Sequence, residues 1–120
     1  MALEIDYSSG IFEAAPSGQT VGTVTGNATL DLTSGNLFNH APSTNVTFVF
    51  SNPPTTGSAY DFTLKVAPSA TVTLTWPSSV KWAGGTAPSA PASGEKDVYN
   101  FFTIDGGTTY YGFQAGDAMA

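Results

Sequence analysis

The sequence contains no cysteine and no arginine, and it has few charged residues of any kind. Without cysteine, the chain has neither a disulfide framework nor a thiolate that could act as a metal ligand or nucleophile. Only 3 basic residues oppose 9 acidic ones, which gives a net charge of −6 and a pI near 4.1. Because a protein that binds nucleic acid needs cations to neutralise phosphates, we do not expect nucleic acid as a partner.

Long apolar runs and helical periodicity are also missing. No stretch approaches the ~20 apolar residues of a membrane-spanning helix, so we do not expect a membrane as a partner. Charged residues make up only 10% of the chain, while 41% is hydrophobic and 12% aromatic. Thr, Ser, Gly and Asn supply most of the polar character, and this composition favours strands and turns over helices. A length of 120 residues suits one domain.

The pattern along the chain predicts an all-β fold. In residues 70–76, for example, apolar side chains alternate with threonine, which is the period of two that is typical of a strand. We predict an antiparallel β-sandwich of jelly-roll-like topology in residues 21–120, preceded by an extended N-terminal arm in residues 1–20. The predicted strands are residues 21–25, 28–33, 37–40, 45–51, 59–66, 70–76, 80–82, 97–104 and 108–113.

Both tryptophans lie in one segment rich in proline and glycine, residues 76–88. Its proline ends the preceding strand because proline has no N–H to donate to a neighbouring strand. We predict that the tryptophans anchor the loop of residues 84–94 to the sheet, and that a glycine pair further on forms a hairpin turn. The predicted structural anchors are Trp76, Pro77, Trp82, Gly106 and Gly107.

Aromatic residues gather in the second half of the chain, and residues 97–104 are apolar on both faces of the predicted strand. Such a strand either lies between two layers or is covered by a partner. Exposed rings could also stack on sugars, but core and subunit interface together explain the pattern more simply. The arm of residues 1–20 is either a frayed terminus or an extension onto a neighbouring subunit. The predicted interface residues are Leu3, Ile5, Tyr7, Ile11, Phe12, Tyr99, Phe101, Tyr110 and Tyr111.

Residues that could carry catalysis or bind a metal are sparse. His40 is the single histidine, and we interpret it as a turn residue rather than part of a Ser–His–Asp arrangement. The turn around Asp105 offers one carboxylate, too few for a calcium site. We therefore expect no enzyme, no metal and no cofactor. The carboxylates that a glycosidase could use, all predicted to be solvated, are Glu4, Glu13, Glu95, Asp97 and Asp105.

Two blocks of sequence carry a resemblance to a known family. The first is residues 76–88, Trp-Pro-Ser-Ser-Val-Lys-Trp-Ala-Gly-Gly-Thr-Ala-Pro, and the second is residues 97–113, with Asp-Gly-Gly followed by Tyr-Tyr-Gly-Phe. Together with residues 27–66 they resemble a module of virion structural proteins of tailed bacteriophages, familiar from phages of marine and freshwater bacteria, including cyanobacteria. The resemblance spans about residues 26–120 and leaves the first twenty-odd residues outside it.

The resemblance implies a location, the virus particle, rather than a chemistry. Because the sequence shows no fibre shaft, coiled coil or repeat, we predict a capsid decoration (cement) protein on the outer surface of the phage head. The implied partners are the major capsid protein and further copies of the chain, as a homotrimer. The alternative is a tail-fibre or receptor-binding tip whose exposed aromatic residues, such as Trp82, Tyr110 and Tyr111, contact host surface glycans.

Overall fold

The computed structural model describes residues 3–6, 11–14, 20–25 and 28–120 of the protein. Within these residues nearly all regular structure is β, which confirms the predicted class. The helical content of the described residues is a single short 3₁₀ turn, η1 (Ala83–Gly85). None of the helices in this part of the chain is long and apolar enough to cross a membrane.

The largest element is a five-stranded sheet with the strand order β10-β12-β11-β8-β5. Its central strands β8, β11 and β12 each alternate between side chains that face the core and side chains that face away from it. β11 and β12 form a hairpin whose turn is the predicted Asp-Gly-Gly turn. Gly106 and Gly107 in this turn have φ values of 70° and 82°. The strands are β5 (Leu37–His40), β8 (Tyr60–Val66), β10 (Val80–Trp82), β11 (Asp97–Thr103) and β12 (Tyr110–Gly116).

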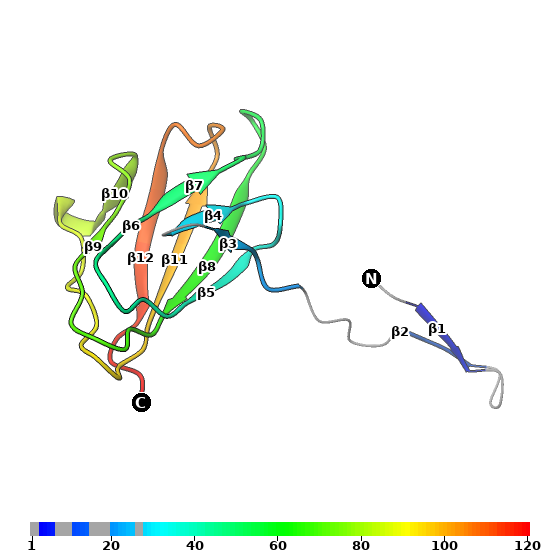
Figure 1. The fold of residues 1–120 in the computed structure, drawn as a ribbon. Helices are drawn as coiled ribbons and strands as arrows, with labels where there is room; N and C mark the ends of the chain where they lie inside the picture. Colours follow the sequence, from blue (N-terminus) through cyan, green and yellow to red (C-terminus); the bar gives the residue numbers. More distant parts are fainter. Residues whose placement is uncertain (1–2, 7–10, 15–19, 26–27) are drawn as a thin grey trace.

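A second layer of shorter strands covers one face of this sheet (Figure 1). Phe50, from this layer, packs edge-on against Phe62, Phe101 and Tyr110, with ring centroids 5.0, 5.1 and 5.0 Å away. The core of the sandwich therefore consists largely of aromatic rings between the two layers. The second layer contains a three-stranded sheet of β3 (Val24–Thr25), β4 (Thr29–Asp31) and β7 (Val49–Ser51), and a pair of β6 (Val46–Thr47) and β9 (Leu74–Thr75).

The predicted antiparallel pairing holds for only part of the sandwich, because its sheets are mixed. The pairs β11–β12, β8–β11 and β3–β4 are antiparallel, but β10–β12, β5–β8, β4–β7 and β6–β9 are parallel. Parallel pairs need a crossover connection, which periodicity within one strand does not reveal. The sheets of the sandwich are therefore not built from antiparallel hairpins alone.

Residues 45–51, predicted as one strand, form two strands that belong to different sheets. The N–H of Phe48 donates to the carbonyl of Thr75 at 2.8 Å, and the next N–H, of Val49, donates to the carbonyl of Ala28 at 3.0 Å. Consecutive N–H groups therefore point toward different neighbours. The chain changes sheets at Phe48 while its apolar alternation continues without interruption.

Other predicted strands are confirmed in place, although some are shorter than predicted or begin later. The predicted strand at residues 37–40 matches β5, whereas only the short β3 and β9 form within residues 21–25 and 70–76. The last strand begins two residues later than predicted because the Asp105 carboxylate accepts the N–H of Thr109 at 2.9 Å, which keeps residues 108 and 109 in the turn.

In the predicted N-terminal arm, β1 (Leu3–Asp6) and β2 (Ile11–Ala14) pair antiparallel, with Leu3 opposite Ala14. They form a two-stranded sheet of their own. Contact of this segment with a neighbouring subunit stays a prediction.

The predicted tryptophan anchors contact the core. Trp76 stacks on Phe48 at 4.5 Å, and Trp82 meets Trp76 edge-on at 5.3 Å. Pro77 follows the end of β9, and its carbonyl accepts the N–H of Val80 in the tight turn into β10. Trp82 lies against the backbone of β12 at Gly112, where an added Cβ would come within 2.8 Å of the indole ring.

The contact between Trp82 and Gly112 gives a stability prediction. A side chain at Gly112 must displace the indole from the core, so Gly112→Val should lower the free energy of unfolding by about 2 kcal/mol. Ala115→Val, at an exposed position of the same strand, is the control and should change it little. Urea unfolding followed by tryptophan fluorescence measures both variants, and equal stabilities would contradict the close packing of Trp82 on β12.

Candidate functional site

The two faces of the five-stranded sheet have different surroundings. Tyr99, Phe101 and Tyr110 point to the inner face, and their exposed fractions are 0%, 0% and 3%. Their assignment to a subunit interface is therefore wrong, because the second layer of the same chain already covers them. Tyr111 points the other way and is 42% exposed.

The opposite side of this sheet, which we call the outer face, carries a stack of aromatic rings. Phe102 of β11 lies between Tyr111 and Phe113 of β12, at centroid distances of 5.1 and 6.0 Å and with interplanar angles of 26° and 14°. Phe113 is 49% exposed, and Ile104 extends the apolar surface beyond the end of β11 at 57% exposed. The outer face is defined by Asp61, Lys65, Lys81, Phe102, Tyr111 and Phe113.

Charged side chains flank this aromatic stack. Lys81 of β10 lies beside Tyr111, and Asp61 of β8 lies beside Phe102 on the other side. Lys65, also on β8, neighbours Val98 of β11. The outer face therefore carries two of the 3 lysines of a protein whose net charge is −6. An aromatic patch with charges at its margins is typical of a surface that binds another macromolecule.

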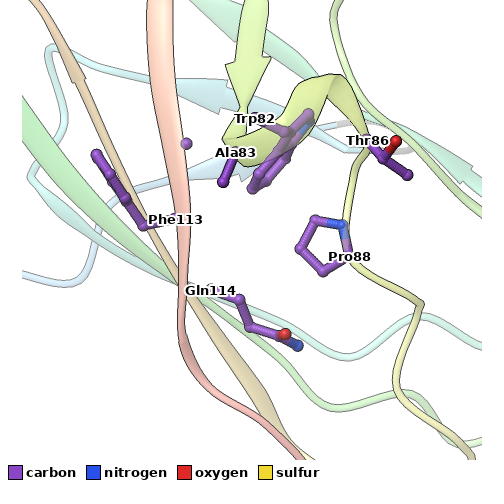
Figure 2. A pocket seen from close by; sticks show the side chains of 7 residues that line it. Trp82, Ala83, Thr86, Pro88, Phe113 and Gln114 are labelled. Carbon is purple, nitrogen blue, oxygen red and sulfur yellow. The ribbon is translucent and has the colours of Figure 1, made fainter.

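A hollow of about 370 Å³ adjoins the outer face at the end of β10. Figure 2 shows Trp82, Pro88 and Gln114 around it, with Phe113 on the far side of β12. The side-chain amide N–H of Gln114 donates to Asp97 at 3.0 Å, and this contact does not use the amide oxygen. An indole ring beside a fixed amide could bind a sugar-sized ligand.

Asp97 orients this amide and is itself completely buried, so the prediction that it is solvated is wrong. Its carboxylate also accepts the hydroxyl of Tyr99 at 3.2 Å and the N–H of Ala118 at 2.8 Å. Burial is the main cause that raises the pKa of Tyr99 far above its ordinary value, and the charge of Asp97 is the second. The phenol therefore stays protonated and remains a hydrogen-bond donor. Asp97 thus joins the start of β11 to the end of the chain and has a structural role.

Of the remaining candidate catalytic residues, Glu4 and Glu13 lie opposite each other in the β1–β2 pair, whereas Asp105 and Glu95 lie in separate loops. Asp105 closes the β11–β12 turn, where the N–H of Thr109 is the main cause that lowers its pKa. Glu95 accepts the N–H of Ala92 at 2.9 Å within its own loop. Among the described residues, no group of three or more His, Asp and Glu side chains could hold a metal ion.

His40 ends β5 rather than lying in a turn, and its ring packs edge-on against Phe48 at 6.0 Å. Its Nε2 is buried and has no hydrogen-bond partner in the part of the chain that the structure describes. Burial lowers the pKa of His40 below its ordinary value.

The side chains of Leu3, Ile5, Ile11 and Phe12 lie outside what the structure describes, as does Tyr7 entirely, so their assignment to an interface stays a prediction. Sequence reasoning missed Phe102, Phe113, Lys81 and Asp61 as members of a surface. The alternation of residues 97–104 was the available signal, because it separates Phe102 from Phe101. Only the pairing of β11 with β8 and β12 reveals their neighbours.

Comparison of the chain with protein-family models, with curated proteins and with solved structures gives no match.

The buried carboxylate of Asp97 gives a second stability prediction. Asp97→Ala leaves the Tyr99 hydroxyl, the Gln114 amide and the Ala118 N–H without their acceptor, so the free energy of unfolding should fall by about 3 kcal/mol. Asp117→Ala, which removes an exposed carboxylate nearby, is the control. Guanidinium unfolding measures both variants, and a loss below about 1 kcal/mol for Asp97→Ala would contradict the role of Asp97 as a shared acceptor.

His40 makes stability depend on pH. Because its pKa in the folded protein lies below the ordinary value of 6.5, the unfolded chain takes up a proton first as the pH falls. The contribution of His40 to the free energy of unfolding is therefore fully present above pH 6.5, and it is lost as the pH falls toward the folded-state pKa. The melting temperature should decrease more between pH 7 and 5 in the wild type than in His40→Leu. Carboxylates titrate in both proteins and affect them equally. Identical slopes of melting temperature against pH would therefore show that His40 contributes nothing to the pH dependence of stability.

Proposed function

We propose that the chain is a structural protein of a tailed-bacteriophage virion, which decorates the outer surface of the head by binding the major capsid protein. The observation that carries this proposal is the arrangement of the two blocks that resemble virion proteins. Residues 80–82 of the first block form β10, and the second block forms β11 and β12. These three strands are neighbours in one sheet, in the order β10-β12-β11. The two blocks thus contribute neighbouring strands to one sheet.

The surface chemistry supports a role in assembly. The five-stranded sheet presents an aromatic outer face that the described part of the chain leaves exposed, with Tyr111 and Phe113 42% and 49% exposed. A protein that works as part of a larger particle can keep such a face, because neighbouring molecules bury it. The net charge of −6 disfavours contact with packaged DNA and suits a position outside the shell.

In physical terms, a decoration protein stabilises a capsid by binding its assembled form more tightly than its separated subunits. Each copy that bridges two capsid subunits adds its binding free energy to the stability of the shell. This role needs a rigid module and surface complementarity rather than catalysis. A core held by aromatic packing between two sheets supplies the rigidity.

The test is cryo-electron microscopy of purified particles of the phage that encodes the chain. We expect many copies in a regular lattice over the head. We also expect particles that lack the protein to release their DNA at a lower temperature. Complementation with the wild-type chain should restore this release temperature. Absence of the protein from purified particles would contradict the proposal.

A receptor-binding tip is the second candidate, and the hollow beside Trp82 is the observation that favours it. Its indole ring and the oriented amide of Gln114 are the kinds of group that stack on a sugar and bind its hydroxyls. The same microscopy separates the two functions. A few copies confined to the tail would support the tip and contradict the decoration role.

A further inference from the structure

One row of the outer face reads basic, aromatic, aromatic, acidic across adjacent strands. Lys81 of β10 neighbours Tyr111 of β12, which lies opposite Phe102 of β11, which in turn lies opposite Asp61 of β8. The strand order β10-β12-β11-β8 places these positions in line. Since neighbouring strands are about 4.8 Å apart, the two charged ends of the row are separated by roughly 14 Å.

This row is complementary to itself. A half-turn about an axis that lies parallel to the strands, above the boundary between β11 and β12, reverses its order. The acidic end of one row then lies over the basic end of the other, and the two aromatic positions exchange places. A closed two-fold contact requires this property. Where residue i of one copy contacts residue j of the other, residue j of the first copy must contact residue i of the second.

We propose that the outer face binds the outer face of a second copy of this chain about such a two-fold axis. Tyr111 then faces Phe102 of the other copy, and Lys81 faces its Asp61. Aligned sheets pack about 10 Å apart with their strands rotated by about 30°. The long lysine side chain can follow the small displacement that this rotation causes at the ends of the row.

The charges of the molecule favour this face over the others for self-association. Two copies that each carry a net charge of −6 repel one another over most of their surfaces. On the strands of the outer face, however, the charged side chains are Lys65, Lys81 and Asp61. The outer face is therefore locally positive and adds no repulsion between acidic groups.

Apolar side chains also lie on both sides of the row along the proposed axis, beyond the end of β11 and on β12, where Phe113 lies opposite the polar Asn100. Ile104 and Phe113 are 57% and 49% exposed on either side of the row. Burying these side chains together with Tyr111 gives the contact its hydrophobic centre, while the Lys81–Asp61 pairs at the margins set its orientation. This inference goes beyond the proposed function and holds for the isolated protein.

A charge exchange, followed by sedimentation velocity on the full chain, tests the proposal. The wild type should be a dimer at micromolar concentration. Lys81→Asp or Asp61→Lys alone places like charges together twice in each dimer, and should raise the dissociation constant at least about tenfold. The double variant Lys81→Asp/Asp61→Lys restores opposite charges and should recover most of the dimer. Lys65→Asp, on the same face but outside the row, is the matched control and should have a smaller effect.

A second pair of variants tests the apolar centre. Tyr111→Ser should give a monomer, because it removes the ring next to the axis, and its exposure makes loss of the fold unexpected. Val49→Ser removes an apolar side chain that is 48% exposed in the second layer, and should leave the dimer intact. Circular dichroism checks that both variants remain folded.

Several results would overturn the proposal. These are a wild-type monomer at high micromolar concentration, a trimer as the smallest assembly, and a double variant no better than the single ones. A monomeric wild type whose Tyr111→Ser variant no longer binds phage particles would assign the outer face to a different protein.

Discussion

The packing of Phe50 against the large sheet is the contact that holds the two layers of the sandwich together. The Phe50 ring touches Phe62, Phe101 and Tyr110, which come from three neighbouring strands of the large sheet. The chain has no disulfide and few charges to hold its layers together, so the packing of these rings has to do it. The contact also fixes register, because a slip of one residue in β8, β11 or β12 would turn its core-facing side chains outward.

The register that fills the core also creates the outer face. Once Phe101 and Tyr110 point inward, the next residues along each strand, Phe102 and Tyr111, must point outward. A polar residue at either position would serve a monomer equally well. The chain instead has two aromatic side chains there, stacked at 5.1 Å. The core needs only one side of these strands, so the second apolar side calls for a separate explanation.

The sequence allowed the all-β class, the aromatic anchors and most strand positions to be predicted, because each depends on local alternation and turn residues. It did not reveal which strands pair in parallel, because a crossover leaves no mark within a strand. The change of sheet at Phe48 could not be predicted either. Alternation of apolar side chains does not show that the N–H groups of Phe48 and Val49 point toward different neighbouring strands. Asp97 was misjudged because two of its three donors, the Gln114 amide and the Ala118 N–H, come from residues that only the fold brings near it.

The candidate site has the same origin. Lys81, Tyr111, Phe102 and Asp61 are scattered through the sequence, and three separate strand pairings align them. A single exposed ion pair contributes little, typically less than 1 kcal/mol, so one Lys–Asp contact could not select a partner. A two-fold axis makes each such contact occur twice, around an aromatic centre that also occurs twice. Weak marginal charges then decide orientation, and the apolar surface between them supplies most of the affinity.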